Sequence, residues 1–140
     1  MTRPVTDIDI AACLEMLKPA AIEASRNAYS PFSKLNVGCA VLGRDGAVYS
    51  GCNVESASYG LTQCAERNAL AHAVSQGETR GAFTAILVYT PVAAQLTPCG
   101  ACRQVMSELM ADRALVICCS EGEQVSHWTV DELLPEPFDF

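Results

Sequence analysis

Three cysteines place the strongest constraint on how this chain can fold. Cys64 opens the motif Cys64–Glu66, and Cys99 and Cys102 lie in Pro98–Cys102, with one predicted strand and a loop between the two motifs. Cys64 and Cys99 fall at predicted helix starts, and Cys102 lies one turn beyond Cys99 on the same helix face. Three thiols are an incomplete tetrahedral set for zinc, and an open fourth position is typical of catalytic zinc. The fold must therefore bring two helix starts to one point.

Hydrophobic periodicity and turn signals predict the elements that could do this. Pro19 should either kink the first helix or lie near the start of a second one. The order α-β-β-α-β-α-β-β predicts one domain over residues 1–140, a three-layer α-β-α sandwich. Its mixed sheet has about five strands, the first pair antiparallel, and helices cover both faces. The predicted elements are a helix over Asp7–Tyr29, strands Val37–Gly43 and Ala47–Asn53 in a hairpin around Arg44–Gly46, helix Cys64–Gln76 closed by Gly77, strand Phe83–Thr90, helix Cys99–Ala111, strands Ala114–Ser120 and Gln124–Thr129, and a last turn capped by Asp131.

Charge and composition exclude several classes of function. The 140 residues carry a formal charge of −7, which disfavours nucleic acid as a partner because phosphate binding relies on Lys and Arg. No stretch reaches the roughly 20 apolar residues of a membrane helix, and the amino terminus does not resemble a signal peptide. We therefore expect a cytoplasmic protein with no membrane partner. In that compartment the eight cysteines indicate metal binding or packing rather than disulfides.

Glu66 and Arg67 follow the first cysteine and suggest hydrolytic chemistry. Helix starts lower thiol pKa values, and zinc held by three thiolates lowers the pKa of its water to give hydroxide as a nucleophile. Glu66 is placed to move protons to and from that water. Three thiolates leave a net charge of −1 on the site, which Arg67 could offset as a donor to a sulfur.

The cysteines admit two other interpretations. A Cys-x-x-Cys pair could be a redox pair, but this would leave Cys64 unexplained. The cysteines could also hold a structural zinc with His72 or His127 as the fourth ligand, although His72 lies about two helical turns beyond Cys64.

With these motifs the chain resembles the zinc nucleobase deaminases and, more closely, the short homotetrameric cytidine deaminases that use three cysteines. The similarity runs from about Tyr29 to Phe138. It rests on Tyr29–Ser33, Val37–Gly38, Gly51–Glu55, Cys64–Arg67, Pro98–Val105 and Leu133–Pro135.

The resemblance implies a role for each matching position. Cys64, Cys99 and Cys102 would bind one Zn²⁺ per chain, and Glu66 would be the proton shuttle. The substrate would be a pyrimidine nucleoside, with sites at the interfaces of a homotetramer. The implied substrate contacts are Asn53 and Glu55 to the ribose 3′-hydroxyl, Phe32 against the pyrimidine, the Ala65 N–H to the carbonyl edge of the base, the Thr97 carbonyl to the amine, and, toward a neighbouring subunit's site, the loop from Ala57 to Tyr59 and Phe138.

The resulting hypothesis is zinc-dependent hydrolytic deamination of cytidine and deoxycytidine in pyrimidine salvage, with zinc hydroxide attacking C4 and Glu66 carrying protons. Deamination of another aminopyrimidine nucleoside is one alternative, and a non-catalytic, zinc-stabilised nucleoside-binding protein is another. Deamination within RNA or DNA is disfavoured by the charge of −7.

Overall fold

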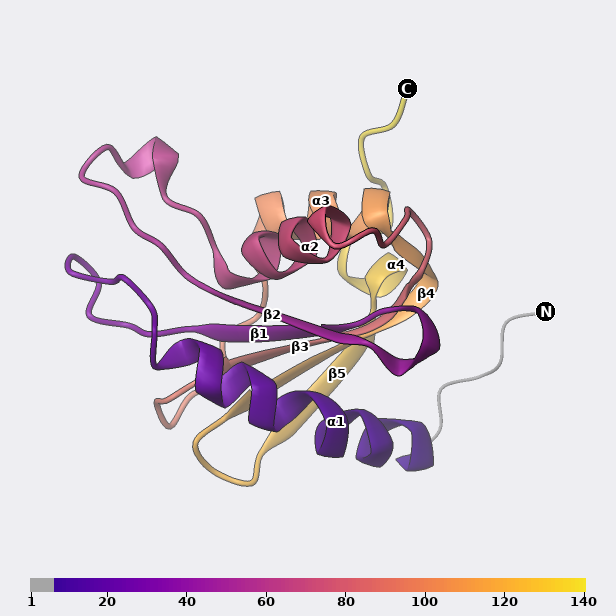
Figure 1. Ribbon diagram of the computed structural model, residues 1–140, viewed down its shortest axis with the longest axis horizontal. Coiled ribbons are helices and arrows are strands. Elements are labelled where there is room, and N and C mark those ends of the chain that lie inside the picture. The colour runs from indigo at the N-terminus through magenta and orange to yellow at the C-terminus, as the bar shows by residue number, and fades with distance from the viewer. Residues whose placement is uncertain (1–6) are drawn as a thin grey trace.

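The chain forms a five-stranded sheet with helices on both faces (Figure 1). The computed structural model describes residues 7–140, with side chains from Asp9 onward. The strand order is β2-β1-β3-β4-β5, in which β3 and β4 are parallel and the other neighbours antiparallel. This confirms the mixed sheet and its antiparallel first pair. The elements are α1 (Asp7–Ser25), β1 (Gly38–Leu42), β2 (Val48–Cys52), α2 (Ala65–Ser75), β3 (Phe83–Thr90), α3 (Gly100–Leu109), β4 (Met110–Ser120), β5 (Val125–Thr129) and α4 (Val130–Leu133), with single 3-10 turns at Arg44–Gly46 and Tyr59–Leu61.

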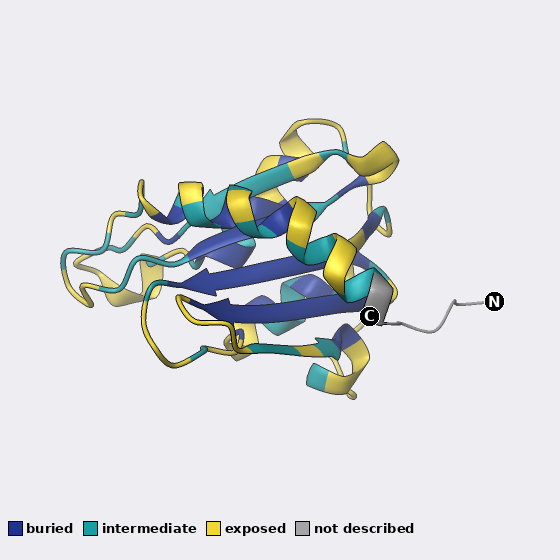
Figure 2. Cartoon of the chain, turned by 90° about the horizontal axis from the view of Figure 1, so that it is seen from below, coloured by how far each residue is buried: buried dark blue, intermediate teal, exposed yellow. Residues whose placement is uncertain are grey.

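The helices divide the core into two layers. α1 packs alone on one face, where Leu17 and Ala21 meet Leu87 and Ile117. α2, α3 and α4 cover the opposite face, and Leu70 and Met106 are fully buried there. The central strands β3 and β4 are buried on both sides, as Figure 2 shows in dark blue. Residues 85–90 of β3 and 114–120 of β4 are accordingly almost entirely apolar, because strands covered on both faces have no solvent-facing side.

Two glycines allow helices to lie directly on the sheet. A Cβ on Gly38 would lie 1.8 Å from the Ala21 carbonyl oxygen of α1, and one on Gly51 would lie 2.5 Å from the Ala69 nitrogen of α2. Only glycine leaves room for a backbone this close. The contact at Gly51 seats α2 on β2 just before the Asn53–Glu55 segment.

Strand direction explains how two distant helix starts meet. β1 is antiparallel to both β2 and β3, so β2 and β3 run in the same direction. The segments that follow these two strands therefore leave the sheet at the same edge. One leads to α2 and the other to α3, so Cys64 and Cys99 reach a common point. Ligands of open α/β sheets bind outside the carboxyl ends of strands for the same reason.

Several predicted boundaries in the first helix and in β4 were wrong. The first helix ends at Ser25 rather than Tyr29, because Tyr29 pairs with the strand extension beyond β2 through Tyr29 N to Asn53 O at 3.0 Å. Pro19 lies inside one continuous helix and does not start a second. Met110 and Ala111 belong to β4 rather than to the preceding helix, since Met110 is extended and pairs with Phe83.

The last turn also differs from the prediction. Thr129 rather than Asp131 is the residue before α4, and Asp131 lies within its first turn. The carboxylate there complements the positive end of the helix instead of capping it. Along residues 7–140, no helix is both long and apolar enough to span a membrane.

Candidate active site

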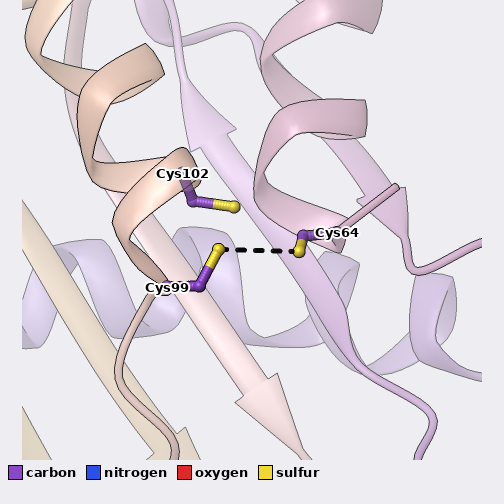
Figure 3. Close-up of side chains that lie close together, drawn as sticks. All are labelled: Cys64, Cys99 and Cys102. Atoms are coloured by element: carbon purple, nitrogen blue, oxygen red, sulfur yellow. Dashed lines mark hydrogen bonds between the residues drawn. The ribbon is translucent and has the colours of Figure 1, made fainter. Parts of the chain in front are cut away.

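The three predicted cysteines form one cluster between the starts of α2 and α3 (Figure 3). Their sulfur atoms all lie within 4.8 Å of one another, and the Cys64 and Cys99 sulfurs are 3.8 Å apart. Cys64 and Cys99 are the residues just before the two helices, whereas Cys102 is fully buried in the first turns of α3. The cluster thus runs from the interior to the surface, where Cys99 is exposed.

The donor set fits a catalytic zinc. Three soft thiolates converge from two directions, and no fourth Cys, His, Asp or Glu joins them among the residues that the structure describes. His72 instead lies against the Ser50 carbonyl, 3.1 Å from its Nδ1, and edge-on to Tyr49. His127 lies on β5 opposite Ile117. A zinc ion here would keep its fourth position for water or substrate, which argues against a closed structural site.

Arg67 lies beside the first cysteine. Its Nη2 donates to Cys64 Sγ at 3.3 Å, three residues along the same helix. Hydrogen bonding to Cys102 and to Arg67 lowers the pKa of the Cys64 thiol to about 5. The guanidinium therefore favours the thiolate form that metal binding requires.

Glu66 is buried next to the thiols. Only 5 % of it is exposed, and it lies close to the thiols of Cys39 on β1 and Cys118 on β4, whose pKa values are raised by burial and then by the Glu66 charge. Burial raises the pKa of Glu66, and the negative charge of Cys64 acts in the same direction, while Arg67 opposes it. A buried carboxyl group whose protonated form is favoured in this way is suited to accept a proton and to pass it on. Ala65, which begins the helix, is fully buried.

Asn53 and Glu55 hold the loop that carries Phe32. The Asn53 amide accepts from Val37 N and donates to Leu35 O, both at 2.8 Å. Glu55 Oε1 accepts from the N–H groups of Phe32 at 2.9 Å and Ser33 at 3.1 Å, and Oε2 accepts from the Ser33 hydroxyl. These bonds, led by the Ser33 hydroxyl, lower the pKa of Glu55. Both side chains therefore have a structural task that the sequence did not indicate.

A cavity of about 300 Å³ adjoins this loop and is lined by Phe32, Ser33, Glu55, Tyr59 and Thr62. The rings of Phe32 and Tyr59 meet edge to face, with centroids 6.1 Å apart. Tyr59 is 77 % exposed, so one side of the cavity is formed by an aromatic ring that faces solvent. A larger cavity of about 560 Å³ lies against α1 and includes none of the three thiols.

The remaining predicted residues lie apart from this cavity wall. Ala57 and Thr97 are exposed in the loops before α2 and α3. Phe138 is exposed in the C-terminal segment, and its backbone is bonded to Gln104. The sequence did not indicate that Ser33 would bind Glu55, or that Arg103 and Gln104 would hold the backbone around the site. Arg103 and Gln104 directly follow Cys102, and this adjacency was the available signal.

Comparison with known proteins agrees with this geometry. The sequence profile of the cytidine and deoxycytidylate deaminase zinc-binding region matches residues 12–119. This chain belongs to that deaminase family. A cytidine deaminase of Halalkalibacterium halodurans is 47% identical over 125 residues, which cover 89% of this chain and 92% of the relative.

The chain shares its fold with solved structures of cytidine deaminases. The Burkholderia pseudomallei enzyme superimposes with a TM-score of 0.83 at 42% identity, covering 96% of this chain and 100% of that one. The Mycobacterium tuberculosis enzyme superimposes with a TM-score of 0.75 at 36% identity, covering 90% and 97%. With a zinc-binding family region and a fitting cluster of three thiols, the chain has a site for one Zn²⁺.

Proposed function

We propose that this protein hydrolytically deaminates cytidine and deoxycytidine to uridine and deoxyuridine. The observation that carries the proposal is the buried Glu66 carboxylate beside a three-thiol cluster with an open ligand position. The relatives named cytidine deaminase support the choice of substrate. Cys64, Cys99 and Cys102 would hold the zinc, which when bound supplies a water of lowered pKa as the nucleophile.

Glu66 does the proton work in this proposal. Its carboxylate takes a proton from the attacking water and delivers it to N3 of the pyrimidine as the C4–O bond forms. It then takes the proton of the new C4 hydroxyl and delivers it to the exocyclic nitrogen, as the C4–N bond breaks and ammonia leaves. Burial raises the pKa of Glu66 above its ordinary value, which makes the carboxylate a stronger proton acceptor than an exposed one. Arg67 donates to the Cys64 sulfur and so would favour its thiolate form throughout these steps.

The substrate contacts are proposed from the same edge of the sheet. Phe32 would pack on the base, while the Ala65 N–H and the Thr97 carbonyl would bind its carbonyl edge and amine. Asn53 and Glu55 would bind the ribose 3′-hydroxyl. Each still has capacity for this, because an amide offers two N–H donors and a carboxylate about four lone-pair sites. Their bonds to the loop at residues 32–37 would hold both groups ready.

The assembly is proposed to be a homotetramer in which Ala57, Tyr59 and Phe138 reach a neighbouring subunit's site. The large exposed fractions of Tyr59 and Phe138 support this, because exposed aromatic rings gain by being covered. A cytoplasmic role in pyrimidine salvage is the setting we propose, and sedimentation velocity tests the tetramer directly.

One assay tests the function. Absorbance is followed on mixing the zinc-loaded protein with cytidine, deoxycytidine, cytosine and a cytosine-containing oligonucleotide. We expect turnover of the two nucleosides and no turnover of the base or the oligonucleotide. Turnover of cytosine as fast as cytidine would contradict the ribose contacts. Binding without turnover would indicate a nucleoside-binding protein, and turnover of only a modified nucleoside would indicate the other alternative.

A further inference from the structure

The side chain of Gln104 binds both polar groups of one backbone residue in the C-terminal segment. Its Nε2 donates to Phe138 O at 2.9 Å, and its Oε1 accepts from Phe138 N at 3.2 Å. The two residues are 34 apart in the sequence, and Gln104 lies on α3 two residues beyond Cys102. A bidentate contact of this kind fixes the orientation of a peptide unit as well as its position.

Arg103, the preceding residue, holds the beginning of the same segment. Its Nη1 donates to Leu133 O at 3.1 Å, and its Nε donates to Pro98 O at 2.8 Å. Two successive residues of α3 thus attach two points of the C-terminal segment to the helix that bears Cys102. Through its bond to Pro98, Arg103 also connects this segment to the residue before Cys99.

The segment between and beyond these attachments has little else to order it. Residues 135–140 are exposed and contain neither helix nor strand. Terminal segments of this kind fluctuate unless they are tied down. The Phe138 ring is 67 % exposed and lies edge-on to Phe140, with centroids 5.2 Å apart. Gln104 therefore holds the backbone of Phe138, while most of the Phe138 ring stays exposed and can contact a partner.

We propose that Gln104 is a positioning residue that presents the Phe138 ring to a second copy of this chain. The inference rests on the proposed function, which assigns Phe138 to a neighbouring subunit's substrate site. Gln104 would act on catalysis only through Phe138, by removing the cost of ordering the C-terminal segment before the ring is seated. It would contact neither the substrate nor the zinc.

A purely structural role for Gln104 makes a different prediction. Alanine forms helices at least as well as glutamine, so Gln104→Ala would leave α3 intact or slightly more stable. Any loss caused by this change must then come from the contacts to Phe138. Gln104→Glu keeps the acceptor for Phe138 N but loses the donor to Phe138 O. Its effect should therefore lie between those of the unsubstituted protein and Gln104→Ala. Glu108→Ala, at an exposed position one turn along the same helix, is the matched control.

The experiment compares these variants with Phe138→Ala and with the Gln104→Ala/Phe138→Ala double variant, all zinc-loaded. Hydrogen exchange of the C-terminal peptide, cytidine kinetics, zinc content and sedimentation are measured. Gln104→Ala should speed exchange at Phe138 and raise KM roughly fivefold or more, as expected for two lost hydrogen bonds, with kcat within about twofold. Zinc content should not change. The double variant should have the same KM as Phe138→Ala alone, because the two changes remove the same contribution, that of the Phe138 ring.

Two results would overturn the proposal: unchanged exchange at Phe138 in Gln104→Ala, or kinetic losses that add in the double variant. The proposed function fails separately, if the unsubstituted protein turns over no nucleoside. In that case exchange and sedimentation still decide on Gln104, because Gln104→Ala should then speed exchange and make the assembly dissociate at higher protein concentration. Unchanged dissociation would exclude presentation of the ring to a second copy.

Discussion

The Arg67 guanidinium lies 3.3 Å from the sulfur of Cys64, one helical turn away along α2. This single contact links a cationic side chain to a cluster that would otherwise hold three thiolates around one Zn²⁺ with a surplus negative charge. Such surplus charge weakens a metal as a Lewis acid, and a donor to the sulfur draws part of it away. In the proposed function, Arg67 would therefore adjust the charge of the site without binding the metal.

Replacing Arg67 by Gln should lower kcat while leaving zinc bound. Hydrogen bonds to charged groups contribute about 1.5–3 kcal/mol, so we expect roughly a tenfold to hundredfold loss. Steady-state kinetics and metal analysis on the same sample make the measurement. Arg80→Gln, at an exposed position after the same helix, is the control and should behave as the unsubstituted protein. Equal activity of the two variants would remove the assigned role.

Glu66→Gln should abolish turnover but retain the metal. The amide keeps the shape of the side chain but cannot carry a proton, and general acid–base catalysis contributes about 10²–10⁴-fold. The fold should tolerate the change, because a neutral amide at a site only 5 % exposed avoids the cost of burying a charge. Deamination rates are measured together with zinc content and thermal unfolding. Near-normal turnover would contradict the assignment of Glu66 as proton shuttle.

The cysteine spacing and strand patterns were sufficient to predict the layers and the meeting of two helix starts. These features were predictable because they depend on hydrophobic periodicity and on the order of the elements, which many residues specify together. The end of α1 was not predictable, because Tyr29 fits the helical pattern but pairs instead with Val54, which is distant in the sequence. The loop-holding bonds of Asn53 and Glu55 were likewise hidden, since their partners lie some 16 to 23 residues away in sequence. Long-range contacts of single residues leave no periodic trace.

Glu55 should make stability depend on pH. Its pKa is lowered in the folded chain, chiefly by the Ser33 hydroxyl, from an ordinary value of 4.5. A carboxylate of this kind stabilises the fold fully above its ordinary pKa, and the contribution is lost as the pH falls through the lowered value. The melting temperature should therefore fall more steeply below about pH 4.5 in the unsubstituted protein than in Glu55→Gln. Thermal scans of metal-free protein from pH 7 to about pH 3 test this, and parallel curves would refute it.

Gly51→Ala should loosen the seat of α2 and disturb the active site from outside it. The new Cβ would lie 2.5 Å from the Ala69 backbone nitrogen, so the helix must move away from β2. Overpacking of this kind costs about 1–3 kcal/mol, and the shift passes along α2 to Cys64 and Glu66. Gly122→Ala is the matched control, because its Cβ would meet nothing within 4 Å. We expect a lower melting temperature and weaker zinc retention against a chelator for Gly51→Ala alone. Unchanged zinc retention despite lost stability would show that the cluster is held independently of how α2 lies on the sheet.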